Sequence, residues 1–395
     1  MNTTQVGIVG AGPAGLMLSH LLHLAGVESV VLEQRSRTYV EARIRAGVLE
    51  QTTVDLLDRS GVGERMRREG LVHQGVNLQF DGHRHRLPLS DLTGGKSITI
   101  YGQQEVVKDL IAARLGAGGQ VWFDVAEVAI EAVETEHPII RYRREGSDAA
   151  AVWEQLRCDV VAGCDGFHGV CRNAVPAGVL RTFERDYPFA WLGILASVAP
   201  STDELIYSYH DRGFSLHSLR SPQLTRLYLQ VDPADDVAAW PDERIWKELQ
   251  IRLGTPGWSL AEGPVIEKSI TAMRSFVVEP MQYRRLFLAG DAAHIVPPTG
   301  AKGMNLAIAD VKVLADALAE WYRSGDGSRL ETYSEVCLTR VWRVQDFSTS
   351  MTDLLHRHHG DEFGSKVQRA RQAYVCYSPA MARTIAENYV GLPLP

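Results

Sequence analysis

The sequence is poor in cysteine and carries no excess of positive charge. Its 395 residues include only five cysteines, which are scattered and form no C-x-x-C pair. This pattern indicates neither a disulfide framework nor a zinc site, so we expect a reducing, cytoplasmic setting and no bound metal. The 48 acidic residues outnumber the 41 basic ones, and the chain therefore lacks the overall positive field that would hold nucleic acid.

A long uninterrupted apolar segment is also missing. Residues 2–27 include no Lys, Arg, Asp or Glu, but Gly12 and Pro13 interrupt them, and the first basic residue of the chain is Arg35. A membrane-spanning helix needs about 20 consecutive apolar residues, and a signal peptide begins with a positively charged region. We therefore expect neither a signal peptide nor a membrane as partner.

The patterns that are present indicate an α/β protein. The length predicts more than one domain. A β-branched apolar run at residues 5–9 predicts a strand, residues 14–25 predict a helix, and residues 30–33 predict a second strand. A strand-helix-strand unit this compact implies parallel strands in a sheet that helices cover.

Other segments predict antiparallel strands. Short alternating apolar stretches between residues 72 and 100 are separated by glycine turns, and similar stretches return at 205–209, 214–220 and 223–231. We expect these pieces to share one sheet. Helix formers with apolar residues at three-to-four spacing dominate residues 303–323 and the last hundred residues, which predicts a helical C-terminal region.

Gly10, Gly12 and Gly15 form a G-x-G-x-x-G pattern between the first predicted strand and helix, and Glu33 ends the next strand. Glycines permit a tight turn and close approach of the backbone to a pyrophosphate, the helix N-terminus favours the negative charge, and the carboxylate can bind ribose hydroxyls. The pattern predicts a dinucleotide site but does not distinguish NAD from FAD.

Two further glycine-rich stretches follow apolar strands. Residues 163–169 read Gly-Cys-Asp-Gly-Phe-His-Gly, which suits either a second nucleotide contact or a tight structural turn. Residues 288–305 contain Gly-Asp-Ala-Ala-His and Pro-Pro-Thr-Gly-Ala-Lys-Gly before a predicted helix. Asp291 could bind hydroxyls of a cofactor, and the amides from residue 300 onward could favour an anionic flavin ring.

These three motifs, in this order, resemble those of the single-component aromatic flavoprotein monooxygenases. The resemblance extends over nearly the whole chain, includes residues 43–50 between the first two motifs, and is most specific at residues 274–281 and 289–303. It implies a mixed α/β fold with a Rossmann-like FAD-binding domain, an inserted antiparallel-sheet substrate domain and a helical C-terminal region. The implied boundaries are 1–72, 97–180 and 268–345 for the first, 73–96 and 181–267 for the second, and 346–395 for the third.

The resemblance implies FAD as cofactor and NADPH or NADH as co-substrate. Glu33 is expected on the adenosine ribose, Arg45 near the pyrophosphate, and Gln103 and Asp291 on the ribityl side. Arginines soon after a nucleotide fold are suitable counter-charges for phosphate. The implied FAD-binding residues are Gly10, Gly12, Gly15, Glu33, Arg43, Arg45, Ala46, Gly47, Val48, Gln103, Asp291, Met304 and Asn305.

For the nicotinamide coenzyme, Gln34 stands where well-known members of the family have an arginine, so the choice between NADPH and NADH stays open. The residues implied for this coenzyme are Arg35, Arg37, Tyr39, His168, Arg172 and Arg274.

The implied reaction is hydroxylation of 4-hydroxybenzoate by O2 next to its phenol, which gives 3,4-dihydroxybenzoate. Period-two alternation places Ser218 and Arg220 on one face of a strand, where an arginine could bind a carboxylate. The resemblance assigns substrate binding to Tyr207, Ser218, Leu219, Arg220, Tyr228 and Pro298.

At the phenol end, the resemblance implies a proton relay through Tyr207, Tyr389 and His73, with the Pro298 carbonyl nearby. An ionised phenol is a better nucleophile at the neighbouring ring carbon, and a hydrogen bond from a second phenol favours that anion. Lys302, Arg226 and Asn305 are expected to support the flavin.

The resemblance also implies a homodimer. Three alternatives stay open at this point: a monooxygenase for another hydroxylated aromatic acid, a nicotinamide-dependent Rossmann dehydrogenase, and a non-catalytic nucleotide-binding regulator.

Overall fold

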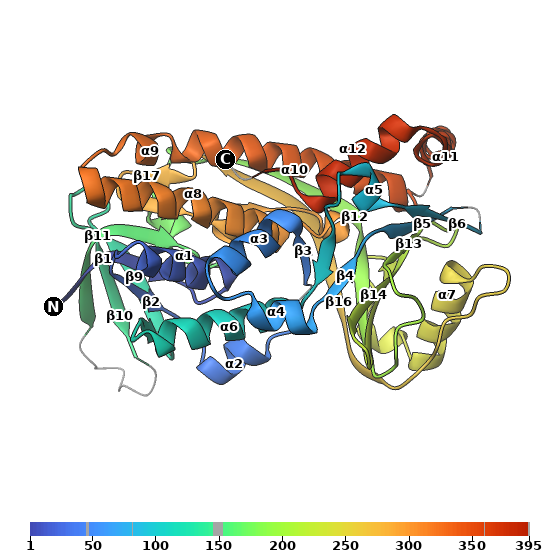
Figure 1. Ribbon diagram of the computed structural model, residues 1–395, viewed down its shortest axis with the longest axis horizontal. Coiled ribbons are helices and arrows are strands. Elements are labelled where there is room, and N and C mark those ends of the chain that lie inside the picture. The colour runs from blue at the N-terminus through green and yellow to red at the C-terminus, as the bar shows by residue number, and fades with distance from the viewer. Residues whose placement is uncertain (45–46, 81, 145–152, 359, 394–395) are drawn as a thin grey trace.

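The computed structural model describes residues 1–44, 47–80, 82–144, 153–358 and 360–393. Within these residues, two eight-stranded sheets lie end to end, and long helices run along one side of both (Figure 1). A third sheet of three short strands is formed by segments between residues 48 and 100. Among the described helices, none combines the length and the apolar character needed to cross a membrane.

The first sheet is the predicted nucleotide fold. Its parallel core has the strand order β18-β11-β1-β2-β8, and β17, β10 and β9 extend it with antiparallel pairs. The predicted strand-helix-strand unit is confirmed as β1, α1 and β2. The strands are β1 (Asn2–Val9), β2 (Ser29–Leu32), β8 (Gln120–Trp122), β9 (Glu127–Glu131), β10 (Ile139–Arg143), β11 (Glu154–Gly163), β17 (Gln282–Tyr283) and β18 (Leu286–Leu288).

Helices α1 and α8 pack against each other beside this sheet, and α6 packs against α1. Their buried apolar residues form one large core with those of the strands. The helices of this part are α1 (Pro13–Leu24), α2 (Arg37–Ala42), α3 (Gln51–Arg59), α4 (Glu64–Glu69), α6 (Gln103–Gly116), α8 (Gly303–Ser324) and α9 (Ser328–Glu331).

The second sheet has the order β19-β16-β12-β15-β14-β13-β5-β6. The three strands predicted after residue 204 are confirmed and share this sheet with β5 and β6, although β13 and β5 pair in parallel. The unpredicted long strands β12 and β16 pair over most of their length. The strands are β5 (Val76–Phe80), β6 (His83–Leu87), β12 (Arg181–Ala196), β13 (Ile206–Ser208), β14 (Ser215–Ser221), β15 (Leu224–Val231), β16 (Val265–Glu279) and β19 (His294–Ile295).

One expectation about this sheet is wrong. Residues 98–100 were expected beside the other hairpin strands, but β7 (Ile98–Ile100) pairs with β3 (Val48–Glu50) and β4 (Leu71–His73) in the small third sheet. An alternating apolar pattern shows that a segment is a strand, but it does not identify its partner. Strand β16 also continues the second sheet to residue 279, beyond the boundary expected at residue 267.

The two faces of the second sheet have different coverings. On one face, apolar side chains of Trp191, Leu216 and Tyr207 pack with the C-terminal helices. On the other, Leu192, Leu229 and their neighbours pack with tryptophan and aliphatic residues of α7. The predicted helical C-terminal region is confirmed, and the remaining helices are α5 (Leu89–Leu92), α7 (Asp242–Leu253), α10 (Tyr333–Leu355), α11 (Glu362–Tyr377) and α12 (Pro379–Val390).

Candidate active site

The glycine motif forms a tight turn at the N-terminus of α1. Gly10 has φ of 103°, and a Cβ on Gly15 would lie 2.0 Å from the Gly10 carbonyl oxygen. Gly12 faces open space, and α1 begins without a capping side chain. Its first amides are therefore available to an anion, as a dinucleotide pyrophosphate requires.

Glu33 lies at the end of β2, beside this turn. Its carboxylate accepts hydrogen bonds from the Ala11 amide (2.7 Å) and the Arg35 amide (2.8 Å). These bonds fix the carboxylate next to the turn, and each oxygen retains a second lone pair for a ribose hydroxyl. Glu33 and the adjacent glycine turn therefore fit the adenosine end of FAD.

The other residues expected at FAD lie at several places in the fold. Gly290, next to Asp291, is close to α1, because a Cβ on Gly290 would lie 3.7 Å from the Ala14 Cβ. Gly47 packs against the backbone just before Gln103, where a Cβ would lie 2.1 Å from the Tyr101 carbonyl oxygen. Asp291 is exposed in a short 3-10 turn, Arg43 is exposed after α2, and Arg45 and Ala46 lie outside the described residues.

The start of α8 is fixed to β3 by Asn305. Its side-chain oxygen accepts from the Glu50 amide (2.9 Å), and its amide nitrogen donates to the carbonyl oxygens of Val48 (2.8 Å) and Ala301 (3.0 Å). All of these partners are protein atoms, so Asn305 joins two parts of the expected flavin site. Met304 is half-buried beside it, and Gly303 faces open space at the helix start.

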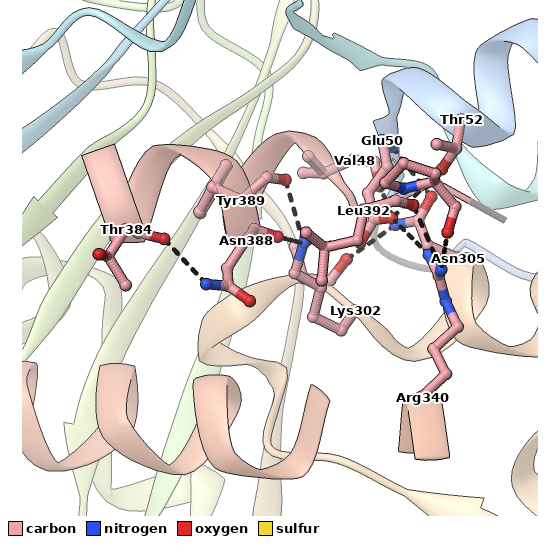
Figure 2. A network of polar contacts seen from close by, with 12 residues as sticks. Val48, Glu50, Thr52, Lys302, Asn305, Arg340, Thr384, Asn388, Tyr389 and Leu392 are labelled. Carbon is pink, nitrogen blue, oxygen red and sulfur yellow. Dashed lines mark hydrogen bonds and ion pairs between the residues drawn. The ribbon is translucent and has the colours of Figure 1, made fainter. Parts of the chain in front are cut away.

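Lys302 is buried in a polar network that the sequence analysis did not foresee (Figure 2). Its ammonium donates to Glu50 (2.6 Å) and to the carbonyl oxygens of Asn388 (2.5 Å) and Tyr389 (3.0 Å). Burial lowers the pKa of Lys302, and the Glu50 carboxylate opposes that effect. Since all three donors have protein partners, the Lys302 charge is directed at Glu50 and at the C-terminal end of α12.

A half-buried cation without a counter-ion among the described residues lies on the second sheet. Arg220 donates from Nη1 to the Ser218 hydroxyl (3.1 Å) and the Leu219 carbonyl oxygen (2.8 Å), while its Nε is buried without a partner. Within the described residues it makes no ion pair. Burial lowers its pKa, and the phenol of Tyr228 is close enough to interact with it. A partly buried charge with a buried donor left unsatisfied is costly, so this position suits an anionic ligand.

Two phenols meet on the same face of that sheet. The hydroxyl oxygens of Tyr207 and Tyr389 lie 2.5 Å apart, and both side chains are buried. Tyr207 pairs with Leu216, which in turn pairs with Tyr228, so three neighbouring strands present these side chains in one row. Burial raises the pKa of both phenols, and Tyr207 and Tyr389 therefore remain protonated at neutral pH.

Comparison with known proteins gives the family of this arrangement. Residues 3–348 match the family model described as FAD binding domain. The chain is 49% identical over 392 residues to p-hydroxybenzoate hydroxylase from Acinetobacter baylyi, covering 99% of this chain and 96% of that protein. The chain belongs to the FAD-binding domain family. FAD is therefore its cofactor, and the predicted family, fold class and flavin-dependent aromatic hydroxylase type are confirmed.

More distant relatives agree with this assignment. Rifampicin monooxygenase from Streptomyces venezuelae is 28% identical over 80% of this chain and 64% of its own length. The crystal structure of p-nitrophenol 4-monooxygenase from Pseudomonas putida superimposes with a TM-score of 0.84 over 98% of both chains, at 19% identity. At that identity the similarity shows the shared fold.

The other residues expected near the two phenols do not form a continuous hydrogen-bonded chain with them among the described residues. His73 is buried, neither ring nitrogen has a partner among the described residues, and burial lowers its pKa to about 4. The Pro298 carbonyl oxygen accepts from the Ala301 amide (2.9 Å). Arg226 pairs with Glu267 (3.1 Å). Neither His73 nor Pro298 has a direct hydrogen bond to Tyr207 or Tyr389 within the described part of the chain.

The residues expected at the nicotinamide coenzyme form two groups. Arg35 stacks on the Tyr39 ring at 5.4 Å, and both line a cavity of about 280 Å³. Arg37 is directed away into an ion pair with Glu41. In the second group, Arg172 and Arg274 each lie 5.0 Å from the Phe167 ring, and His168 is exposed next to it.

Sequence reasoning missed two members of the site network, Glu50 and Arg340. Arg340 lies 3.5 Å from Glu50, which also binds Lys302. Glu50 falls in the segment 43–50 that carries the resemblance, but Arg340 has the sequence context of an ordinary helix charge. Only the contact across the fold distinguishes it.

Proposed function

We propose that the protein hydroxylates 4-hydroxybenzoate at the carbon next to its phenol and releases 3,4-dihydroxybenzoate (protocatechuate). FAD, O2 and either NADPH or NADH complete the reaction. The single observation that carries the proposal is one sheet face that presents a half-buried arginine, Arg220, with no ion pair among the described residues, and a buried phenol pair, Tyr207 and Tyr389. A ring with a carboxylate at one end and a phenol at the other complements both features.

The arginine end would hold the carboxylate. The planar guanidinium of Arg220 can donate two parallel hydrogen bonds to a carboxylate, and its buried Nε is a donor that lacks a partner among the described residues. Ser218 already binds the guanidinium and fixes its direction. Tyr228 and Leu219 complete this end in the proposal.

The phenol end would favour the ionised substrate. Because burial raises the pKa of Tyr207, its hydroxyl stays protonated and can donate to the oxygen of the substrate. A donor aimed at a phenolate lowers the pKa of that phenol, and the anion activates the neighbouring ring carbon. Tyr389 would then receive or return the proton through its 2.5 Å contact with Tyr207, with His73 and Pro298 as the proposed further members of the relay.

When bound, FAD supplies the redox chemistry, since it accepts hydride from the nicotinamide coenzyme and activates O2. The residues of this chain bind and orient both partners and exclude water. We propose that Asp291, Met304, Asn305 and the amides of α1 hold the cofactor. Arg226 and Lys302 would support its working position, and the two groups containing Arg35 and Arg172 would bind NADPH or NADH.

A substrate series tests the proposal. NAD(P)H oxidation by the FAD-loaded enzyme is followed with 4-hydroxybenzoate, with benzoate, which lacks the phenol, and with phenol, which lacks the carboxylate. We expect strong stimulation by 4-hydroxybenzoate alone. Equal stimulation by phenol would remove the role of Arg220, and a higher turnover of another hydroxybenzoate would identify a related aromatic acid as the substrate.

We also propose that the protein is a homodimer and that it is cytoplasmic. The family resemblance supports a homodimer, which light scattering of the purified protein tests directly. The scattered cysteines support a cytoplasmic location. The division into a discontinuous FAD-binding domain, a substrate domain and a helical C-terminal region is likewise a proposal, and limited proteolysis at its boundaries tests it.

A further inference from the structure

The helix that carries Tyr389 ends immediately after it. Helix α12 stops at Val390, and Gly391 has φ of 90°, a conformation that favours glycine. A Cβ on Gly391 would lie 2.2 Å from Oε2 of Glu50. The chain therefore turns at Gly391 directly against the Glu50 carboxylate, and this position has no room for a side chain.

Two cations hold this end of the chain. Lys302 binds the carbonyl oxygens of Asn388 and Tyr389, the position where a helix favours positive charge. Arg340, on α10, donates from Nη1 to the carbonyl oxygens of Leu392 (3.2 Å) and Pro393 (3.0 Å). Both cations also reach Glu50, at 2.6 Å and 3.5 Å (Figure 2).

The Arg340 contacts depend on its particular chemistry. Its side chain is 12% exposed, and the same guanidinium reaches two main-chain carbonyls and one carboxylate. A planar fork with five donors can do this, whereas a single ammonium group cannot reproduce the same geometry. Arg340 therefore connects α10, the turn after α12 and Glu50 in one place.

We propose that Arg340 is a positioning residue that holds the C-terminal segment so that the Tyr389 hydroxyl meets that of Tyr207. The inference rests on the proposed function, because it assigns the contact to ionisation of the substrate phenol. A contact between two hydroxyls at 2.5 Å has little tolerance: a shift of about 1 Å exceeds the usual range of an O–H···O bond. Arg340 touches neither substrate nor FAD in this account.

The test compares Arg340→Ala and Arg340→Lys with Arg343→Ala, which removes an exposed arginine from the same helix. For each FAD-loaded variant, the pKa of bound 4-hydroxybenzoate is measured from the pH dependence of its phenolate absorbance. Product formed per NAD(P)H oxidised is measured alongside. For Arg340→Ala we expect the pKa of the bound phenol to rise by about one unit, a tenfold loss of phenolate at a given pH.

Substrate affinity at low pH, where the phenol is neutral, should stay within about twofold in that variant, because Arg220 is untouched. Arg340→Lys should give an intermediate phenol pKa, and Arg343→Ala should match the parent protein. A phenol pKa and coupling unchanged in Arg340→Ala would overturn the inference, as would a loss of thermal stability alone. If Arg340→Ala yields no folded holoenzyme, an unchanged phenol pKa in Arg340→Lys overturns it instead.

The failure of the proposed function would look different. In that case the parent protein itself would neither ionise nor hydroxylate 4-hydroxybenzoate, and the inference would fall with it.

Discussion

Tyr207 and Tyr389 place their hydroxyl oxygens 2.5 Å apart although 182 positions separate them in the sequence. Tyr207 comes from the second sheet and Tyr389 from the last helix. The contact therefore exists only when the C-terminal region packs on the substrate face of the sheet. In the proposed reaction, this packing completes the phenol end of the site.

Replacing Tyr207 by phenylalanine removes the donor to the substrate oxygen and leaves the carboxylate end intact. We expect 4-hydroxybenzoate to bind with nearly unchanged affinity. Hydroxylation should slow by about a hundredfold or more, with NAD(P)H oxidation uncoupled from product. Rapid mixing of the reduced, substrate-bound enzyme with O2 measures this step. Tyr322→Phe, which removes a hydroxyl bound to Gln5 and Asp159 on the first sheet, is the matched control, and equal behaviour of the two variants would contradict the role of Tyr207.

Arg220 should destabilise the substrate-free protein and contribute to the affinity for 4-hydroxybenzoate. Arg220→Lys keeps the charge but loses the fork, so we expect 4-hydroxybenzoate to bind about 10- to 100-fold more weakly. Arg220→Met removes a half-buried cation whose buried Nε has no partner among the described residues, and it should stabilise the substrate-free protein by about 1 kcal/mol while abolishing binding. Titration calorimetry and chemical denaturation measure the two effects. A less stable Arg220→Met protein that still binds substrate would remove Arg220 from the pocket.

Alanine substitutions at Gly12 and at Gly15 should have different effects on stability and on FAD binding. A Cβ on Gly15 would clash with the Gly10 carbonyl oxygen, whereas one on Gly12 would point into open space. Gly15→Ala should therefore destabilise the apoprotein itself. Gly12→Ala should leave the apoprotein melting temperature unchanged and weaken FAD binding, because the added methyl group occupies the position expected for the pyrophosphate. Flavin fluorescence titration of the apoproteins distinguishes the two, and normal FAD affinity in Gly12→Ala would move the pyrophosphate elsewhere.

Buried histidines should make the fold sensitive to acid. His356 accepts a hydrogen bond from the Trp191 indole at 2.7 Å, and burial lowers its pKa from 6.5 to about 3. Because its pKa is lower in the folded state, its stabilising contribution is complete above pH 6.5 and is lost as pH falls toward 3. Between about pH 7.5 and about pH 5 the loss is about 2 kcal/mol.

The variant His356→Gln isolates this contribution. Its free energy of unfolding should change between the two pH values by about 2 kcal/mol less than that of the parent protein. Replacing the exposed His23 by glutamine provides the control. Identical pH dependence in His356→Gln and the parent protein would show that this histidine does not report on folding.

The sequence was most informative where a motif is local. The turn at Gly10 and Gly15, the carboxylate of Glu33 and the alternating face with Ser218 and Arg220 each depend on residues close together in the chain, so their spacing predicts the geometry. The resemblance added the pairing of Tyr207 with Tyr389, which no local pattern contains.

Long-range packing limited the remaining predictions. The partner of Lys302 could not be found from spacing, because Glu50 lies 252 positions away. The partners of residues 98–100 were misplaced for the same reason. Arg340 was not singled out at all, because its role depends on the turn at Gly391 across the fold.

One measurement tests the central claim most directly. The FAD-loaded protein is incubated with 4-hydroxybenzoate, NAD(P)H and ¹⁸O-labelled O2, and the product is identified by mass spectrometry. The account predicts 3,4-dihydroxybenzoate carrying a single labelled oxygen at the new hydroxyl, formed in proportion to the NAD(P)H consumed. Unchanged 4-hydroxybenzoate, or a product whose new oxygen comes from water, would contradict it.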